Sequence, residues 1–250
     1  MKFNIIHIPS VDSTNNYAVQ QVVNSESNEG DVIITTNQKK GKGQGANNWE
    51  SEPGSNLTFS LVLKPKFVTP SNQFVLTQVI SLAISDLIIE HLKSVDDGHV
   101  KIKWPNDIYI NEKKVAGILI QNFIVGNSID YSIVGIGLNI NQREFISDAR
   151  NPVSLIHHLN RKTDINSLLD ELLEKISSRY EVLKMDYDFS KLRKEYLDRL
   201  FKMRSWSKYR DDKGDFEGKI VDVDEFGRLE ISTRSGNTRI YMFKEVEFVL

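Results

Sequence analysis

The spacing of apolar residues along the chain changes from strand-like to helical and back several times. Between residues 17 and 23, apolar side chains recur at helical spacing, and Asp12 or Ser13 stands where such a helix would be capped. Runs of apolar and β-branched residues around this segment predict strands at 3–8, 31–36 and 57–63.

The middle of the chain predicts one long helix and a group of paired strands. Residues 72–92 are apolar around much of the circumference of a helix, which is typical of a core helix. Further strands are predicted at 100–104, 107–110, 115–123 and 129–138. The polar turn at 111–114 gives the second and third of these the spacing of a hairpin.

Two helices and a set of short strands complete the pattern. Helical spacing is present over 165–185 and again over 189–200. Beyond Met203, β segments separated by Gly- and Asp-containing turns are predicted at 206–210, 218–223, 229–233, 238–242 and 246–250. We therefore expect an α+β domain at 1–203 with a small β-barrel appended at 204–250.

Composition excludes several classes of protein. With 250 residues, 40% of them hydrophobic, the chain can bury a core, so intrinsic disorder is excluded. A net charge of -2 argues against a surface built to bind nucleic acid, and no segment approaches the roughly 18 to 20 uncharged apolar residues that a membrane span needs. The absence of Cys excludes disulfides, thiolate zinc sites and thiol nucleophiles and favours a cytoplasmic location. The five histidines form no ligand-spaced cluster, so metal-dependent hydrolysis is not supported.

A Gly-rich loop at 37–48 is the first candidate for chemistry. Gly41, Gly43 and Gly45 would let backbone N–H groups approach an anion, and neighbouring lysines add positive charge. The spacing is not that of a Walker phosphate loop. A flexible surface loop with solvated lysines is the alternative.

The second candidate is the sequence K-W-P-N-D together with the lysine after it. Because Trp104 precedes Pro105, a strand is expected to end there. Asn106 and Asp107 follow, and Asp107 could hold a Mg²⁺ that bridges nucleotide phosphates. Lys114 stands where the next strand begins, so its ammonium could point at a fixed anion. Ordinary turn residues and a solvated lysine are the alternatives.

Two weaker candidates accompany these. Gly135 and Gly137 would let a ligand or another backbone pack against a strand, and Asn139 offers a donor and an acceptor. A β-bulge explains the same residues. The Ser-Thr-Asn sequence at 13–15 could bind the polar end of a ligand, or it could only cap a helix.

Six motifs, taken in order, resemble those of the biotin protein ligase family. They are D-S-T-N at 12–15, Q-x-x-G-K-G-Q at 38–44, N-L-x-x-S at 56–60, K-W-P-N-D at 103–107, K-V-A-G-I-L at 114–119 and G-I-G-L-N-I-N at 135–141. The resemblance implies a class II synthetase-like catalytic domain, with a mixed sheet packed by helices, at 1–203. It implies an SH3-like domain at 204–250.

The resemblance also implies a two-step reaction. Biotin and MgATP give biotinyl-5'-AMP and pyrophosphate, and a lysine of a biotin carboxyl carrier protein, usually that of acetyl-CoA carboxylase, then accepts the biotin. ATP, Mg²⁺ and biotin are the expected small molecules, with no tightly bound redox cofactor. Since the first step brings a carboxylate to an α-phosphate, preorganised cations and donors would supply most of the catalysis.

By motif position, the resemblance implies a role for each site residue. Lys114 matches the catalytic lysine, which bridges the biotin carboxylate and the α-phosphate. The expected biotin-binding residues are Ser13, Thr14, Asn15, Gln38, Gly43, Gln44, Gly45, Gly117, Gly135 and Gly137. The expected nucleotide- and phosphate-binding residues are Lys42, Trp49, Lys103, Trp104, Asn106 and Asn139, and the expected Mg²⁺ ligand is Asp107.

The Gly-rich loop departs from the pattern G-R-G-R-x-G-R that is common in the family. Lys42 and Gln44 stand at the two leading arginines, and Ala46 and Asn47 replace the later Gly-Arg pair. Lysine lacks the bidentate fork of arginine, and glutamine carries no charge. We therefore expect weaker retention of the adenylate than in arginine-loop relatives.

Some family members also carry an amino-terminal helix-turn-helix domain that represses biotin genes. Here the D-S-T-N motif begins at residue 12, which leaves no room for that domain, so no binding to DNA is expected. No membrane partner is expected, and the chain could be a monomer or a homodimer.

Two other functions remain open. A lipoate ligase or octanoyltransferase has the same catalytic fold, although the K-W-P-N-D and G-K-G-Q motifs and the terminal β segment favour biotin. A module that binds biotin or its adenylate without turnover is the other alternative, which Lys114 and Asp107 disfavour.

Overall fold

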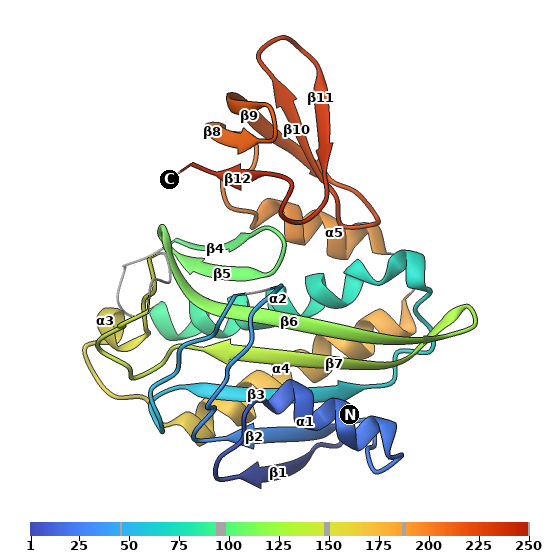
Figure 1. Ribbon diagram of the computed structural model, residues 1–250, viewed down its shortest axis with the longest axis vertical. Helices are drawn as coiled ribbons and strands as arrows, with labels where there is room; N and C mark the ends of the chain where they lie inside the picture. Colours follow the sequence, from blue (N-terminus) through green and yellow to red (C-terminus); the bar gives the residue numbers. More distant parts are fainter. Residues whose placement is uncertain (46, 94–98, 148–150, 187–188, 250) are drawn as a thin grey trace.

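The computed structural model describes residues 1–45, 47–93, 99–147, 151–186 and 189–249. It contains a seven-stranded sheet packed with helices and a separate five-stranded sheet at the carboxyl end (Figure 1). The α+β fold expected from the sequence is confirmed. Ala46 of the Gly-rich loop and Leu250 of the last predicted strand lie outside the described residues.

The large sheet is mixed, with the strand order β1-β2-β3-β7-β6-β5-β4. Its strands are β1 (Asn4–Ile8), β2 (Asp31–Thr35), β3 (Leu57–Leu63), β4 (Val100–Lys103), β5 (Asp107–Ile110), β6 (Lys113–Val125) and β7 (Ser128–Leu138). β1 and β2 are parallel, and the other neighbours are antiparallel. Every residue of β3 is buried because helices cover both faces of the sheet.

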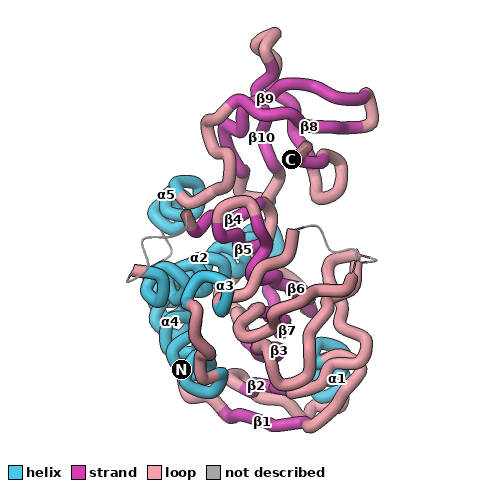
Figure 2. The backbone as a smooth tube through the Cα atoms, turned by 90° about the vertical axis from the view of Figure 1, so that its left-hand side faces the viewer, coloured by secondary structure: helices cyan, strands magenta, loops and turns pink. Residues whose placement is uncertain are grey.

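Figure 2 shows the helices on the two faces of this sheet. α1 (Thr14–Val23) lies on one face, and α2 (Phe74–Leu92) and α4 (Ile165–Met185) lie on the other. α5 (Phe189–Asp198) packs against α2, and a short α3 (Ile156–Leu159) was not predicted. Val22 is buried, whereas Val23, the last apolar residue of the predicted helical pattern, is 68% exposed at the end of the helix.

α2 is the central helix of the core. Residues 70–92 have a mean hydropathy of 1.5 and are long and apolar enough for a membrane span by length and composition alone, although Asp86 and Glu90 interrupt the apolar run. The structure gives the reason for this composition, since 72% of the apolar stretch is buried and α2 packs against β4, β5 and β6 of the sheet and against α4 and α5.

Tight turns move two strand boundaries from their predicted places. In the β5–β6 hairpin, Ile110 pairs with Lys113, so the turn has two residues and Lys114 lies inside β6. Asn111 adopts a φ of 57° in this turn, as such turns require. In the second sheet, Asp211 pairs with Gly214, which extends that strand four residues beyond its predicted start at Gly218.

The second sheet has the order β11-β10-β9-β8-β12, and all its pairings are antiparallel. Its strands are β8 (Trp206–Asp211), β9 (Gly214–Val223), β10 (Leu229–Thr233), β11 (Thr238–Tyr241) and β12 (Glu247–Phe248). It stands above the β4–β5 hairpin and α5, at one end of the large sheet (Figure 1).

Candidate active site

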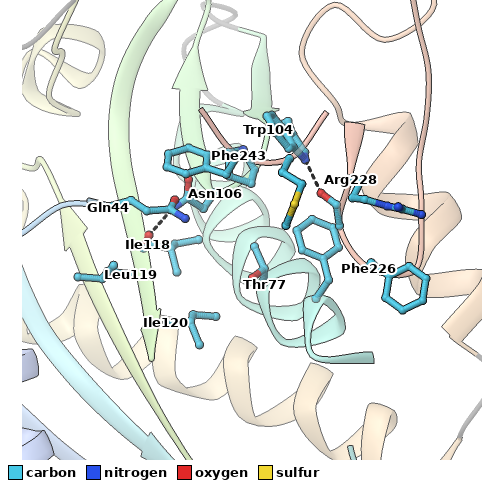
Figure 3. A pocket seen from close by; sticks show the side chains of 14 residues that line it. Gln44, Thr77, Trp104, Asn106, Ile118, Leu119, Ile120, Phe226, Arg228 and Phe243 are labelled. Atoms are coloured by element: carbon cyan, nitrogen blue, oxygen red, sulfur yellow. Dashed lines mark hydrogen bonds between the residues drawn. The ribbon is translucent and has the colours of Figure 1, made fainter. Parts of the chain in front are cut away.

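A cleft of about 860 Å³ lies between the large sheet, the Gly-rich loop and the second sheet. Every predicted site residue except Gly45 and Asn139 lines it. A smaller cavity of about 210 Å³, toward the second sheet, shares Gln44, Trp104 and Asn106 with the cleft (Figure 3). Segments far apart in the sequence thus meet around one space.

A buried polar cluster at the start of α1 borders the cleft. Gln38 Oε1 accepts the backbone N–H of Thr14 at 2.9 Å and lies 3.2 Å from its hydroxyl oxygen. The hydroxyl of Ser60, on β3, lies 2.8 Å from Thr14 Oγ1 and 2.5 Å from Asn15 Oδ1. Ser13 caps the helix with its side chain. Linked polar groups of this kind are rigid and suit the polar end of a ligand.

The carboxamide of Asn15 explains the glycine at position 135. It donates to the carbonyl of Leu119 at 3.2 Å and fills the space that a Cβ of Gly135 would occupy. From the sequence, Gly135 was expected to lie against a ligand. In the structure, its immediate neighbour is a side chain of α1, so packing alone already requires the glycine.

The Gly-rich loop folds back on itself as a short hairpin. The N–H of Gly43 donates to the carbonyl of Asn47 at 2.8 Å, and the N–H of Trp49 donates to the carbonyl of Gly41 at 3.0 Å. A Cβ at Gly41 would overlap the backbone of Trp49. The N–H of Gly43 is therefore bonded within the loop and is not directed at an anion in this conformation.

The indole of Trp49 covers the floor of the cleft. It reaches within 3.1 Å of the place a Cβ would take on Gly117, and it fills that place on Gly137. The ammonium of Lys114 lies 5.6 Å from the ring centroid, within cation–π range. Trp49 Nε1 is buried without a partner among the described residues. Because an unpaired buried donor costs free energy, a ligand that bonds or displaces this indole would gain from doing so.

Lys114 and Asp107 form an ion pair inside the cleft. Nζ lies 2.8 Å from Oδ1, and the two side chains are 29% and 25% exposed. Asp107 pairs across the hairpin with Gly117, and the side chain of Lys114 crosses that glycine, where a Cβ would lie 3.2 Å from its Cε. A partly exposed pair is worth about 0–1 kcal/mol, so a bound phosphate could replace the carboxylate at small cost.

Residues 104–106, between β4 and β5, are held in place by hydrogen bonds to β6 and α5. The side-chain amide of Asn106 donates to the carbonyl of Ile118, and the N–H of Ile118 returns a bond to the carbonyl of Asn106 at 3.2 Å (Figure 3). Tyr196 of α5 donates to the carbonyl of Pro105 at 3.0 Å. Burial raises the pKa of Tyr196, which keeps this hydroxyl protonated. Asn106 thus supports the cleft through the backbone of β6.

Trp104 connects the large sheet to the second sheet. Its Nε1 donates to the carbonyl of Gly227 at 2.9 Å, and its ring lies 6.2 Å from that of Phe243 (Figure 3). Gly227 has a φ of 84° and leaves no room for a Cβ beside Phe74. Lys103 donates to the hydroxyl of Tyr109 at 3.2 Å, so its charge also lies at this junction.

The comparisons with known proteins agree with this geometry. The sequence profile of the Biotin/lipoate A/B protein ligase family matches residues 7–139, which is more than half of the chain. The chain belongs to this family. The matched residues include the end of β1, all of β2 to β7 and the predicted motifs up to Asn139.

Relatives extend the match over nearly the whole chain. A bifunctional ligase/repressor BirA from Bacillus subtilis is 26% identical over 95% of this chain and 72% of its own length. A biotin--[acetyl-CoA-carboxylase] ligase from Paracoccus denitrificans is 27% identical over 82% of this chain and 85% of its own. The solved structure of a biotin protein ligase from Aquifex aeolicus with biotin and ATP superimposes with a TM-score of 0.80, at 27% identity, over 98% of this chain and 99% of that one.

Asn139 lies beside the cleft of this family member and does not line it. Its Nδ2 donates to the carbonyl of Val153 at 3.1 Å, and its N–H donates to the carbonyl of Val115 at 2.9 Å. Its Oδ1 is buried without a partner among the described residues. Asn139 therefore joins the end of β7 both to β6 and to the segment after residue 151, and a role toward nucleotide stays a prediction.

The structure adds residues to the site that the sequence analysis did not assign to it. Ser60 of β3 belongs to the polar cluster through its contacts with Thr14 and Asn15, and Thr58 of the same strand lines the cleft. Lys244 and Phe248 line the cleft from the second sheet. No local pattern marks these last two, because their place depends on how the second sheet docks.

The carboxylates of the cleft fit a metal that arrives with a nucleotide. Among the residues that the structure describes, no cluster of three or more His, Asp or Glu side chains could hold a metal ion on its own. Mg²⁺ in nucleotide sites usually uses one or two carboxylates together with phosphates. Asp107 alone satisfies that requirement.

Proposed function

We propose that this chain is an ATP-dependent biotin protein ligase, which activates biotin and transfers it to a carrier protein. The observation that carries the proposal is the Lys114–Asp107 pair, which lies in one cleft with the polar cluster of α1 and the cationic loop. The relatives named as biotin ligases, and the Aquifex aeolicus structure with biotin and ATP, support the same function.

In the first step, we expect the polar cluster to bind the ureido end of biotin. Thr14, Gln38 and Ser60 already bond one another there, so they are preorganised for such a group. The biotin carboxylate oxygen attacks the α-phosphorus of ATP, and pyrophosphate leaves. The charge of Lys114 offsets the repulsion between carboxylate and phosphate.

In the second step, the acceptor is the ε-amine of a lysine on a biotin carboxyl carrier protein. Its nitrogen attacks the acyl carbon of the adenylate, the amine loses a proton, and AMP leaves. Lys114 stays beside the α-phosphate and polarises the acyl phosphate. Trp49, once the loop closes over the nucleotide, would help to exclude water from an anhydride that hydrolyses readily.

The metal enters this scheme as part of MgATP. Asp107 would hold Mg²⁺ together with the phosphates, and the ion would reduce the negative charge of the leaving pyrophosphate. In the ligand-free cleft, Asp107 is bonded to Lys114. Binding of MgATP would therefore break this ion pair. The α-phosphate would replace Asp107 as the partner of Lys114, and Mg²⁺ would replace Lys114 as the partner of Asp107.

The two domains of the chain would have different roles. Residues 1–203 form the catalytic domain, and residues 204–250 form the SH3-like domain that closes one side of the cleft. The chain would act in the cytoplasm, on the carrier protein of acetyl-CoA carboxylase or of a similar biotin-dependent carboxylase.

The direct test is mass spectrometry of a carrier domain after incubation with the purified chain, ATP, Mg²⁺ and biotin. We expect the mass of one biotinyl group on the acceptor lysine and none on a carrier whose acceptor lysine is changed to Arg. An unmodified carrier, together with no biotin-dependent exchange between ATP and pyrophosphate, would overturn the proposal.

Lipoate is the competing substrate because the family includes lipoate ligases. The same exchange assay is therefore run with biotin, with lipoate and with octanoate. Exchange stimulated only by biotin supports the proposal. Exchange stimulated by lipoate or octanoate and not by biotin would assign the chain to the other branch of the family.

A further inference from the structure

Lys244 occupies an unusual backbone conformation at the edge of the cleft. It lies between β11 and β12 with a φ of 71°, in the left-handed region that non-glycine residues rarely adopt. Glu245 stabilises this turn, since its carboxylate accepts the N–H of Met242 at 2.7 Å. A strained residue that the surroundings hold in place is often found at a functional site.

The side chain of Lys244 reaches from the second sheet to the Gly-rich loop. A Cβ on Gly45 would overlap the ammonium of Lys244 and would lie 2.8 Å from its Cε. Lys244 also lines the cleft that contains Lys42 and Lys114. The absence of a side chain at Gly45 is therefore what allows this lysine to approach the loop.

Other cations at this end of the cleft are already bonded. Lys40 pairs with Asp12 at 2.8 Å, and Lys114 pairs with Asp107. Lys42 donates to the side chain of Asn16 at 3.3 Å. Within the described part of the chain, Lys244 has no ion pair or hydrogen bond from its ammonium, and the ring of Phe243 lies 6.0 Å away.

We propose that Lys244 binds the polyphosphate of the nucleotide, at the phosphates beyond the α-phosphate that Lys114 contacts. This inference rests on the proposed function. It assigns to the second sheet a cation that the loop lacks, since Gln44 and Asn47 are uncharged. A lysine binds phosphate as a point charge, and a distant part of the chain can supply it.

The test compares Lys244→Gln, Lys244→Arg and the wild-type chain, with Lys213→Gln as the control. Lys213 is an exposed lysine of the same sheet, in the β8–β9 turn, and it does not line the cleft. Affinities for MgATP, inorganic pyrophosphate, AMP and biotin are measured by calorimetry, each ligand alone.

We expect Lys244→Gln to weaken MgATP and pyrophosphate about tenfold, which is the loss of one charge-assisted contact. AMP and biotin should bind as in the wild type, because neither carries the outer phosphates. Lys244→Arg should restore most of the affinity, and Lys213→Gln should change nothing. The difference between wild type and Lys244→Gln should also shrink between about 50 and about 500 mM salt, because exposed charges become screened over roughly this range.

Three results would overturn the inference. They are an affinity of Lys244→Gln for MgATP within twofold of the wild type, an equal loss for AMP and biotin, and an arginine variant as weak as the glutamine variant. Because these measurements need no turnover, they are separate from the test of function. A wild-type chain that binds pyrophosphate through Lys244 but shows no biotin-dependent exchange would refute the proposed function alone.

Discussion

At the scale of single residues, the charge of Lys114 is the central feature of the cleft. Asp107 balances it at 2.8 Å, and both side chains remain more than a fifth exposed. Solvent therefore weakens their attraction compared with a fully buried pair. An ammonium held in this way is available to an incoming phosphate and is already in position when the phosphate arrives.

We predict that Lys114→Ala lowers biotin-dependent ATP–pyrophosphate exchange by roughly a hundredfold or more, the usual loss when one preorganised donor is removed. The fold should persist, because the backbone bonds of Lys114 to residues 151 and 153 remain. Circular dichroism and thermal unfolding would check this point.

The control for that variant is Lys113→Ala, which removes the exposed lysine next to it. It should keep wild-type exchange and change the free energy of unfolding by less than about 0.5 kcal/mol. If Lys114→Ala retained about a tenth or more of the exchange rate, the catalytic role of Lys114 would be refuted, and it would be a solvated lysine next to a turn.

At the scale of elements, the start of α1 is fixed to the sheet by polar bonds and by one close approach. Asn15 bonds to Leu119 of β6, lies beside Ser60 of β3 and covers Gly135 of β7. One side chain thus connects the helix to three strands. The position of the polar cluster relative to Lys114 depends on this connection.

Gly135→Ala should destabilise the chain by about 1–3 kcal/mol, since its Cβ would displace a carboxamide that is bonded on both sides. Biotin affinity should fall with it, because the polar cluster would shift. Chemical denaturation and calorimetry with biotin measure the two effects.

A double-mutant cycle with Asn15→Ala isolates the cause. Removing the carboxamide creates the space that the new methyl group needs, so Gly135→Ala should cost much less in the Asn15→Ala background than alone. Additive losses would show that the glycine is required for another reason.

At the scale of the whole molecule, charged side chains join α2, α4 and α5 on the side away from the cleft. Arg179 bonds to Asp86 at 2.6 Å and to Glu195 at 2.7 Å, and Arg199 bonds to the same two carboxylates. α5 precedes the second sheet in the chain, and Arg193 of α5 forms an ion pair with Asp222 of β9. The network therefore helps to fix α5, against which the second sheet is positioned, to α2 and α4.

This network should make stability depend on acid pH. The hydrogen bond from Arg179 lowers the pKa of Glu195 below its usual 4.5, and the charges of Arg179 and Arg199 act in the same direction. A lowered folded-state pKa contributes stability above the unfolded value, and this contribution is lost as the pH falls through the folded value. We expect a steady free energy of unfolding from pH 7 to about 5 and a decline below about 4.5.

Glu195→Gln is the variant that tests the assignment. It should be less stable than the wild type at pH 7, and its decline between about pH 5 and pH 3 should be shallower, because one titrating group is missing. Urea unfolding at each pH measures both. An unchanged slope would mean that other carboxylates produce the acid sensitivity.

The sequence predicted the elements well where the signal was local. The predicted limits of β3 and α4 agree with the observed ones. Of the two residues predicted as possible caps of α1, Asp12 and Ser13, Ser13 is the one that caps the helix. The errors lie at turns and helix ends, as at Val23 and Gly214, because a shift of a few residues there hardly changes the apolar pattern. Most predicted site residues do line one cleft, but their individual bonds, such as that of Asn106 to Ile118, were not predictable.

By itself, the sequence determined the strands and helices, the family resemblance and the candidate lysine, because periodicity and motifs are properties of neighbouring residues. The tertiary structure decided the rest. The packing of helix, loop and the two sheets placed Asn15 over Gly135, the indole of Trp49 over two glycines, and Lys244 of the second sheet against Gly45 of the loop. These contacts join residues that are 68 to 199 positions apart in the chain, and no local pattern encodes such pairs because they form only when elements pack.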